Sequence, residues 1–412
     1  MALLVQKFGG TSVGTPERVR AVAARIARDR QAGHDVVVVV SAMGDTTDEL
    51  LELADQVSPE ATRRHTRELD MLLTAGERIS MALVAMALRD LDVEAISFTG
   101  SQAAIITDGH HTVARIEEVR ATRVQEELAR GAVVIVAGFQ GVSRGREVTT
   151  LGRGGSDTTA VALAAALGAE RCDIFTDVDG VYTADPRRVP EARRIDVVGY
   201  GEMTELASAG AQVMHPRAVE MGARFKVPIR VRSCFGEHDD EGTLITERRE
   251  TMEGLVLTGL ACDGGYARLI LRGLPAETSA VSRLLSALAD RGISVDMLGQ
   301  ADRHDGRRQL QLTVREDRLD DAREVCSAML EGLGGEYVDA QTGLSRVALV
   351  GSGMTEMPGV YARAFAALVK EGIEVHAIST SSISIALMVN TSHAERSLQV
   401  LHADFELAER DG

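Results

Sequence analysis

The stretch from Thr149 to Thr159 reads Thr-Thr-Leu-Gly-Arg-Gly-Gly-Ser-Asp-Thr-Thr and holds three glycines within four residues. Because glycine has no Cβ, these positions let backbone N–H groups approach an anion closely. Ser156 and Asp157 follow at once, and either side chain is suited to cap the N-terminus of a helix. The stretch therefore predicts an anion-binding turn at the start of a helix.

The flanking sequence places this turn inside a βαβ unit. Residues Ala160–Leu167 are apolar on every side, which is typical of a buried helix, and Gly168 is suited to end it. Strand-like runs precede the turn at Val133–Ala137 and follow the helix at Asp173–Thr176. This order predicts a parallel α/β sheet with a ligand site at the turn.

Arg153 lies among the glycines, where its guanidinium is free to hold a carboxylate or a phosphate through two parallel hydrogen bonds. The alternative is a surface arginine beside an ordinary helix cap, because glycine turns also occur without any ligand. The spacing matches neither the P-loop nor the dinucleotide-binding fingerprint. We therefore expect a different kind of phosphate or carboxylate site.

The composition limits the classes of function. The chain has 412 residues, enough for two or three domains, and its 45% hydrophobic and 26% charged residues are typical of a globular protein. A net charge of −16 argues against nucleic acid or an anionic membrane as the main partner. The scattered cysteines predict neither zinc nor disulfides, which fits a reducing cytoplasm. The first residues lead straight into a strand, so we expect no signal peptide and no membrane span.

A second glycine turn lies near the N-terminus. Leu3–Phe8 reads as a strand, Gly9-Gly10-Thr11-Ser12 follows, and Thr15-Pro16 is suited to begin a helix that runs to about Arg30. Lys7 stands at the end of the strand beside this turn. A lysine in that position can neutralise the oxygens of a transferring phosphoryl group, whereas the simpler alternative is a solvated lysine.

Val36–Val40 is a run of five valines, typical of a strand buried on both faces of a parallel sheet. It ends at Ser41-Ala42-Met43-Gly44-Asp45-Thr46-Thr47. Ligands of open α/β sheets bind beyond the carboxyl ends of the strands, so Ser41 and Thr47 are candidate substrate contacts, or else plain turn hydroxyls. Glu77 lies in a helical stretch from Glu68 to Arg89. It could pair with Arg153, bind a substrate ammonium, or lie on the surface.

The segment Thr176–Arg187 combines a strand end with carboxylates, a glycine, a tyrosine and an arginine. This combination favours a nucleotide platform, with Tyr182 bordering a base and Arg187 reaching phosphate. Calcium is the competing interpretation of the aspartates, but the EF-hand spacing is absent. Val227–Arg232 then reads as an edge strand.

The composition becomes polar near Gly236–Glu250, which predicts a surface linker. Beyond it a β-α-β-β-α pattern occurs twice, starting with the strands Ala267–Gly273 and Ser345–Gly351. This internal repeat is the split βαβ arrangement.

Taken together, these motifs resemble those of the bacterial aspartokinases, in which an amino-acid-kinase domain precedes two ACT domains. The matching segments are Lys-Phe-Gly-Gly-Thr-Ser at 7–12, Ser-Ala-Met-Gly-Asp-Thr-Thr at 41–47, Thr-Ala-Gly-Glu-Arg at 74–78, Gly-Arg-Gly-Gly-Ser-Asp at 152–157, Thr-Asp-Val-Asp-Gly-Val-Tyr-Thr-Ala-Asp-Pro-Arg at 176–187 and His-Pro-Arg at 215–217. The resemblance covers the first part of the chain closely and the repeat more loosely.

The resemblance implies an α/β fold with a three-layer αβα amino-acid-kinase-like catalytic domain, built on a mainly parallel sheet, over residues 1–240. A linker at 241–254 and two ferredoxin-like ACT repeats, at 255–340 and 341–412, would follow. The implied reaction transfers the γ-phosphoryl group of ATP to the side-chain carboxylate of L-aspartate, giving 4-phospho-L-aspartate and ADP, toward lysine, threonine and methionine.

The resemblance also implies roles for individual residues. Lys7 and Asp157 would be catalytic, with Asp157 organising the reacting centre together with Mg²⁺, although no metal-ligand set is predicted. Aspartate would contact Ser41, Thr47, Glu77, Arg153, Gly154 and Ser156. Phosphate and nucleotide would contact Lys7, Gly9, Gly10, Ser12, Thr176, Asp177, Tyr182, Arg187 and the position of Gln212.

The chain departs from the family pattern at three places. Gln212 stands where relatives usually have lysine. Leu-Pro-Ala-Glu-Thr-Ser at 274–279 replaces the usual Asp-x-Pro-Gly, and Ser-Thr-Ser-Ser-Ile-Ser at 379–384 lacks both charges of the usual Ser-Thr-Ser-Glu-Ile-Arg. The alternatives are therefore an isozyme of a dedicated pathway with altered feedback, an effector-binding subunit, or another amino-acid kinase. We expect a homo-oligomer formed through the ACT repeats, and Met252 is a candidate start for a shorter regulatory subunit.

Overall fold

The computed structural model describes residues 2–211, 213–237, 240–247, 256–303, 305–354 and 359–408. The chain forms two compact units. The first comprises Met1–Val181, Arg194–Ser208 and Gln212–Thr251, and the second comprises Tyr182–Arg193, Ala209–Ala211 and Met252–Gly412.

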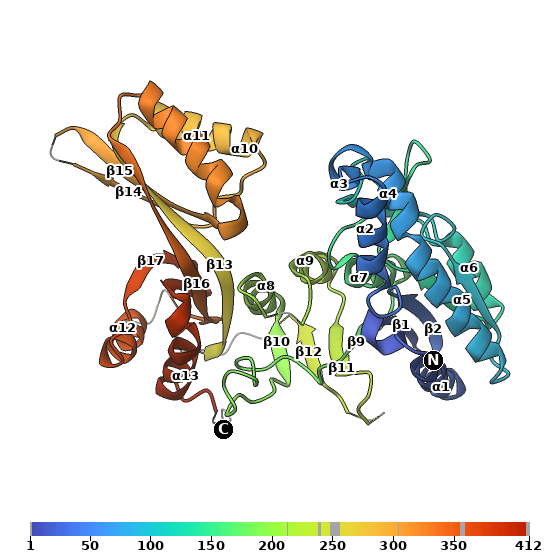
Figure 1. Cartoon of the computed structure of the whole chain (residues 1–412). Helices are drawn as coiled ribbons and strands as arrows, with labels where there is room; N and C mark the ends of the chain where they lie inside the picture. The colour runs from blue at the N-terminus through green and yellow to red at the C-terminus, as the bar shows by residue number, and fades with distance from the viewer. Residues whose placement is uncertain are drawn as a thin grey trace. The chain divides into compact units, whose positions relative to one another are not determined.

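The first unit is built on an eight-stranded sheet in the order β10-β12-β11-β9-β1-β2-β6-β3 (Figure 1). Its neighbouring strands run parallel except for the antiparallel pair β11–β12. The strands are β1 (Leu3–Phe8), β2 (Asp35–Val40), β3 (Ala95–Phe98), β6 (Val133–Ala137), β9 (Arg171–Thr176), β10 (Val197–Gly199), β11 (Ile229–Ser233) and β12 (Thr243–Thr246).

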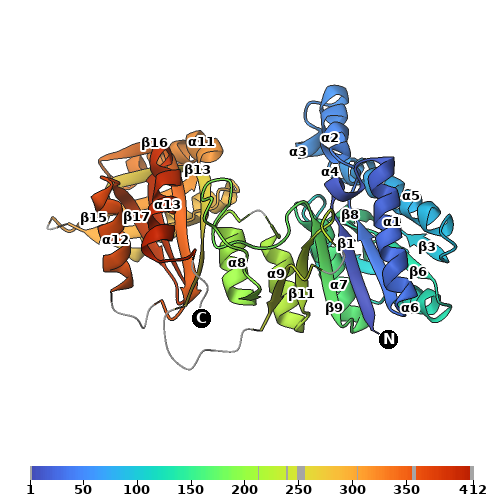
Figure 2. The ribbon, with the colours of Figure 1, turned by 90° about the horizontal axis from the view of Figure 1, so that it is seen from below.

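Helices cover both faces of this sheet, and α1 and α5 lie on the face opposite α7 (Figure 2). The helices of the unit are α1 (Pro16–Gln31), α2 (Thr46–Val57), α3 (Ala61–Arg64), α4 (Thr66–Leu73), α5 (Ala75–Arg89), α6 (Thr122–Ala129), α7 (Gly155–Leu167), α8 (Tyr200–Ser208) and α9 (Pro216–Phe225). The valine run of β2 is fully buried, and its alternate residues Val36, Val38 and Val40 pack into the core shared with α1 and α5. The predicted three-layer αβα architecture is confirmed.

A second sheet of four strands, in the order β5-β4-β7-β8, was not foreseen from the sequence. Its strands are β4 (Ile105–Thr107), β5 (Ile116–Val119), β7 (Gln140–Ser143) and β8 (Val148–Thr150). Between β4 and β6 the structure has β5 and then α6. Since β8 leads directly into the glycine turn at Gly152–Gly155, this small sheet supports that turn.

The predicted linker at 241–254 and the predicted edge strand at 227–232 both need correction. Thr243–Thr246 is β12 of the large sheet, and β11 lies between β12 and β9 rather than at an edge. A strand of four residues that pairs antiparallel to its neighbour leaves little trace in a polar stretch of sequence. The remainder of the predicted linker, from residue 248, lies outside the described residues until Val256.

The second unit has a six-stranded antiparallel sheet in the order β14-β15-β13-β16-β18-β17. Its strands are β13 (Val256–Pro275), β14 (Leu298–Asp302), β15 (Arg307–Arg315), β16 (Tyr337–Ser352), β17 (Val375–Thr380) and β18 (Ser384–Asn390), and its helices are α10 (Thr278–Asp290), α11 (Leu319–Gly332), α12 (Val360–Lys370) and α13 (Ala394–Asp404).

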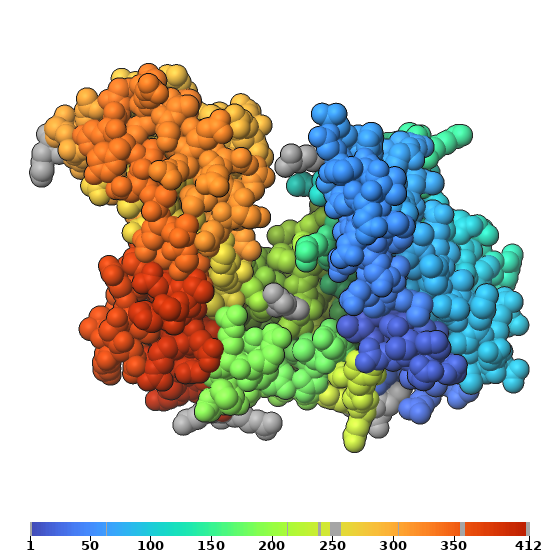
Figure 3. All heavy atoms as spheres, in the orientation of Figure 1, coloured from blue at the N-terminus to red at the C-terminus, as the bar shows by residue number. Residues whose placement is uncertain are grey.

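The strands β13 and β16 are long and pass through two lobes, each with its own hydrophobic core. One lobe contains β14, β15, α10 and α11, and the other contains β17, β18, α12 and α13; Figure 3 shows their surfaces in orange and red. The first part of β13, Val256–Asp263, pairs with the last part of β16 and packs in the lobe that contains α12 and α13. The two repeats are therefore interleaved in the sequence, and the boundary predicted at 340/341 does not separate the lobes.

Together α4 and α5 make a helical stretch, Thr66–Arg89, that is long and apolar enough to cross a membrane by length and composition alone. Its inner face, including Val84, Ala85 and Leu88, packs into the core of the first unit. A core helix of a globular domain has the same composition, so this stretch is weak evidence for a membrane span.

Candidate active site

Three of the predicted loops meet at the carboxyl edge of the large sheet, because β1, β2, β6 and β9 run parallel. The N–H of Gly9 donates to the carbonyl of Phe175 (3.3 Å), and the N–H of Ser41 donates to that of Phe8 (3.1 Å). The N–H of Gly138 in turn donates to the carbonyl of Val40 (3.0 Å). The turns after β1, β2 and β9 therefore lie side by side, as the α/β pattern predicted.

The turn after β1 requires glycine for steric reasons. A Cβ on Gly10 would lie 2.9 Å from the carbonyl oxygen of Ala42, and the N–H of Gly44 donates to the Gly10 carbonyl (3.0 Å). A Cβ on Gly9 would lie 3.5 Å from Nζ of Lys7. Ser12 is fully buried in the short helix Gly10–Val13. The turn therefore packs against the loop after β2 and brings its backbone close to the Lys7 ammonium.

Lys7 and Asp157, the two predicted catalytic residues, form an ion pair. The Lys7 Nζ lies 2.7 Å from Oδ1 of Asp157, and each side chain is only 12% exposed. Lys7 comes from β1 and Asp157 from the first turn of α7. The pair therefore joins the two glycine turns and places a positive and a negative group together where little water can screen them.

The first glycine turn has two residues in left-handed conformation, Gly152 (φ +74°) and Gly154 (φ +68°). A Cβ on Gly154 would lie 2.1 Å from Cβ of His215, so only glycine fits there. Gly154 is itself the N-cap of α7, and Gly168, also left-handed, ends the helix as predicted. The prediction that Ser156 or Asp157 caps the helix was wrong, because the helix begins earlier, at Gly155, and both residues lie in its first turn.

Arg153 is exposed on this turn, and within the described residues it has no ion-pair partner. Ser156 is buried, and a Cβ on Gly138 would lie 2.7 Å from its hydroxyl oxygen. Ser156 therefore faces the end of β6. The turn therefore carries one exposed cation, Arg153, and brings the Ser156 hydroxyl to the end of β6.

Glu77 is buried, 3% exposed, in the first turn of α5. Its Oε1 accepts the N–H of Ala42 (3.2 Å), whereas Oε2 is buried and has no hydrogen-bond partner among the described residues. Burial raises the pKa of the Glu77 carboxyl to about 7, although hydrogen bonds from its own backbone N–H and that of Ala42 act in the opposite direction. The alternatives of a surface glutamate and of a partner for Arg153 do not hold, and the binding of a cationic ligand group remains.

The structure shows fewer contacts for the remaining residues that were predicted to bind aspartate or nucleotide. Ser41 and Thr47 are half-buried, at the end of β2 and in the first turn of α2. The Thr176 hydroxyl donates to Oδ1 of Asp177 (2.9 Å) beyond β9. Tyr182 and Arg187 belong to the second compact unit, where Arg187 pairs with Asp185 (2.9 Å). Gln212 lies outside the described residues.

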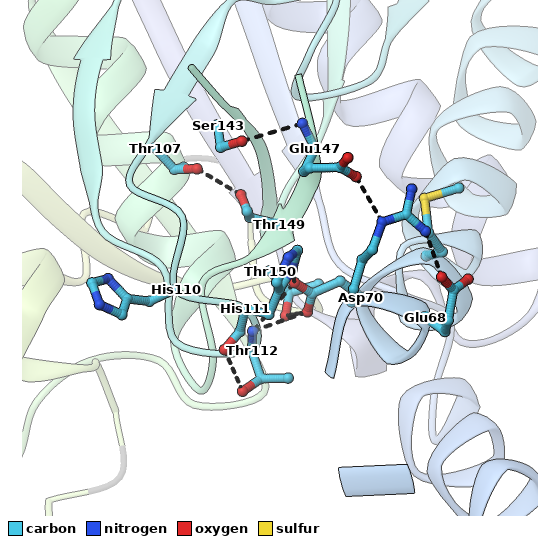
Figure 4. Close-up of polar contacts among 12 residues, drawn as sticks. Glu68, Asp70, Thr107, His110, His111, Thr112, Ser143, Glu147, Thr149 and Thr150 are labelled. Carbon is cyan, nitrogen blue, oxygen red and sulfur yellow. Dashed lines mark hydrogen bonds and ion pairs between the residues drawn. The ribbon is translucent and has the colours of Figure 1, made fainter. Parts of the chain in front are cut away.

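A buried carboxylate, Asp70 on α4, was missed by the sequence analysis. It accepts hydrogen bonds from Thr150 and Thr112 and lies against His111 (Figure 4). An aspartate between Leu69 and Met71 on a helix gives no signal that distinguishes it from a solvated residue.

Arg217 was quoted only as part of a motif, and the structure shows its contacts. Its guanidinium donates to the carbonyls of Leu151 (2.7 Å) and Ala114 (3.0 Å), next to the glycine turn. Burial lowers the pKa of this guanidinium. Arg217, in the first turn of α9, therefore stabilises the segment that leads into the glycine turn.

A groove of about 1030 Å³ lies between β5, α7 and α9, lined by residues such as Ala162, Arg217 and Met221. It includes none of the predicted site residues. We place the candidate active site at the carboxyl edge of the sheet instead, because the Lys7–Asp157 ion pair lies there and because Glu77, which bonds the loop after β2, has a buried Oε2 with no hydrogen-bond partner among the described residues.

Comparison with known proteins shows the family of the chain. Residues 2–233 match the amino acid kinase family, and residues 347–405 match an ACT domain. The aspartokinase of Geobacillus stearothermophilus is 46% identical over 99% of this chain and 98% of its own length. The chain belongs to the aspartokinases. The aspartokinase of Mycolicibacterium smegmatis is 47% identical over 100% of this chain and 98% of its own length.

Among solved aspartokinases, E. coli aspartokinase III in complex with aspartate and ADP (R-state) aligns with a TM-score of 0.81 and 28% identity, covering 98% of this chain and 100% of the other. The complex of the same enzyme with lysine and aspartate (T-state) aligns with a TM-score of 0.74. The fold class predicted from the motifs is thus confirmed over the whole aspartokinase chain.

Proposed function

We infer that the chain is an aspartate kinase. In this reaction a side-chain carboxylate oxygen of L-aspartate forms a bond to the γ-phosphorus of ATP, and the bond to the β–γ bridging oxygen breaks, so that ADP leaves and 4-phospho-L-aspartate forms. The observation that carries the inference is the Lys7–Asp157 pair at the junction of two glycine turns. Phosphoryl transfer depends on such positioning and charge compensation more than on a covalent protein group.

Aspartate is held, in this proposal, by groups of opposite charge. Arg153 binds the α-carboxylate, since its guanidinium is exposed on a rigid turn. Glu77 binds the α-ammonium through its Oε2, which otherwise has no partner among the described residues. Ser41, Thr47, Ser156 and the backbone of Gly154 supply the remaining hydrogen bonds.

Lys7 compensates charge on the transferring phosphoryl group, helped by the backbone N–H group of Gly10 and by Ser12, while Gly9 has no side chain that would crowd the Lys7 ammonium. Ser12 supports this role because its buried hydroxyl has no hydrogen-bond partner in the described part of the chain. Thr176 and Asp177, beyond the end of β9, contact the nucleotide. At the position of Gln212 a neutral amide replaces the cation of relatives, which should weaken one phosphate contact.

The residues present fit a magnesium ion of the kind that ATP brings. Within the described residues no cluster of three or more histidines, cysteines, aspartates or glutamates forms a cage. Mg²⁺ is typically held by one or two carboxylates together with substrate phosphates, and Asp157 would be the protein ligand. The ion would neutralise phosphate charge there.

We further propose a homo-oligomer formed through the second unit and located in the cytoplasm. The edge strand β14 is exposed along its whole length, and unpaired edges are templates for pairing with another chain. Met252, the candidate start of a shorter subunit, lies outside the described residues.

The test is an ADP-release assay with ATP, Mg²⁺ and a panel of L-aspartate, D-aspartate, L-glutamate and N-acetyl-L-glutamate. Hydroxylamine traps the acyl phosphate product as a hydroxamate. We expect both ADP and hydroxamate with L-aspartate alone. Faster turnover of another acid, or no turnover with any, would contradict the proposal.

A further inference from the structure

Asp70 is a fully buried carboxylate, 0% exposed, on α4. Its Oδ1 accepts the hydroxyl of Thr150 at 2.6 Å and the N–H of Thr112 at 3.1 Å. Its Oδ2 lies 2.6 Å from Nδ1 of His111 (Figure 4). A buried charge is costly unless it is fully hydrogen-bonded, so these contacts define one conformation of the two segments that supply them.

Both segments support the glycine turn. Thr150 ends β8, three residues before Arg153. Its carbonyl accepts the N–H of Ala114 at 2.9 Å, so the His111–Ala114 segment and β8 are also tied to each other. The carbonyl oxygen of Thr112 would lie 3.1 Å from a Cβ on Gly152. Asp70 thus holds the incoming strand of the turn and the segment against which the turn packs.

The same helical run also carries Glu77. The N–H of Thr74 donates to the carbonyl of Asp70 at 3.1 Å, and α5 begins at the next residue. Glu77 in turn accepts the N–H of Ala42. Asp70, in the first part of the α4–α5 run, therefore anchors the turn with Arg153, and Glu77, about two helical turns further along, anchors the loop after β2.

We propose that Asp70 is a positioning residue for aspartate binding. It does not contact substrate; it fixes the glycine turn so that Arg153, a flexible and exposed side chain, starts from a backbone held at a set distance from Glu77. This inference rests on the proposed role of Arg153. A small displacement of such a group is enough to weaken binding of a ligand that needs both charges at once.

The test is steady-state kinetics of Asp70→Asn and Thr150→Val in the full chain. Asparagine has nearly the same shape as aspartate, but one carboxylate oxygen becomes an N–H₂ group that cannot accept the hydrogen bonds made to Asp70. Thr150→Val removes only the 2.6 Å hydrogen bond from the Thr150 hydroxyl to Asp70. We expect KM for aspartate to rise about tenfold in Asp70→Asn and by a smaller factor in Thr150→Val, with KM for ATP changed by less than about twofold. Thr150→Val covers the case in which Asp70→Asn does not fold.

The matched control is Glu202→Gln, which alters another buried carboxylate of the same unit that accepts a backbone N–H, from Gly199 at 3.1 Å. It should lower the melting temperature without changing KM for aspartate. Asp70→Asn should also have little further effect in an Arg153→Ala background, because the residue it positions is gone.

The outcomes are distinguishable. If Arg153→Ala leaves KM for aspartate unchanged, the proposed substrate contact fails, and this inference fails with it. If Arg153→Ala raises that KM but Asp70→Asn and Thr150→Val do not, only the positioning role is overturned. Equal rises in KM for both substrates, or full additivity of Asp70→Asn with Arg153→Ala, would also overturn it.

Discussion

Lys7 is the residue on which the phosphoryl-transfer role depends most directly. Lys7→Met removes the cation 2.7 Å from Asp157 but keeps an unbranched chain of similar size. We expect kcat to fall by about 10²-fold or more, as for loss of one preorganised electrostatic group, while the chain still folds. The matched control is Lys226→Met, which removes an exposed lysine 3.4 Å from Glu247 and should leave kcat unchanged. A folded Lys7→Met variant with near-normal kcat would rule out the role.

The raised pKa of Glu77 predicts that kcat/KM for aspartate depends on pH. Only the ionised carboxylate attracts an ammonium group, and burial raises the pKa of Glu77 to about 7. In the free enzyme, kcat/KM for aspartate should therefore fall as the pH drops through about 7. A profile of kcat/KM against pH measures this, with Glu77→Gln as the comparison. An acidic limb that persists unchanged in Glu77→Gln would assign the titration to another group.

The same carboxyl should destabilise the fold at neutral and higher pH. Its pKa rises from 4.5 to about 7 on folding, so the stability it contributes is present below the unfolded pKa and is lost as the pH rises through about 7. The difference is on the order of 3 kcal/mol. Glu77→Gln should therefore raise the melting temperature more at about pH 8 than at about pH 5. An equal change at both pH values would argue against the raised pKa.

At the scale of elements, the approach of α5 to the loop after β2 depends on Gly76. A Cβ at this position would lie 2.7 Å from Cβ of Ala42, so Gly76→Ala must push the helix away and lengthen the 3.2 Å bond from Ala42 to Glu77. We expect KM for aspartate to rise about tenfold because of this displacement. The substitution itself favours the helical conformation by about 1 kcal/mol, so the helix should still form.

Gly332→Ala serves as the control for Gly76→Ala, because it is also a helical position but has no atom within 4 Å of the added Cβ. It should keep the gain in helix stability and leave both KM values unchanged. If Gly76→Ala behaves in the same way as Gly332→Ala, then the loop adapts and the packing does not set the site.

At the scale of the whole molecule, the altered ACT repeats predict weak feedback. Among the residues that replace the usual charged motifs, Ser279 bonds Glu277 (3.1 Å) and the hydroxyls of Ser381 and Ser384 bond each other (2.9 Å). An effector site that lacks one charged partner for its amino-acid ligand loses about 1–3 kcal/mol of binding free energy for each missing hydrogen bond. The affinity for the effector then falls by roughly one to two powers of ten. We expect weak or absent inhibition by lysine plus threonine.

The measurement is initial velocity with millimolar lysine, threonine and both together. Strong concerted inhibition would show that other residues of the second unit build the effector site. The long strands β13 and β16, which run through both lobes, are then the first place to look, since each carries side chains into both cores.

The features of this protein that depend on local patterns could be predicted from its sequence alone. The glycine turns, the valine strand β2, the apolar helix α7 and the capped start of α1 were predictable because each is encoded within a few neighbouring residues. That Lys7 and Asp157 act at one centre was implied only by the family resemblance, and the structure shows them as an ion pair.

Features that depend on partners far apart in the chain were revealed only by the three-dimensional structure. Asp70 meets Thr150 across 80 residues, β12 joins β11 from a stretch that looked like linker, and the two repeats share β13 and β16. Such contacts leave no local signal, because the free energy that selects them comes from packing and pairing between segments rather than from the conformational preference of either segment.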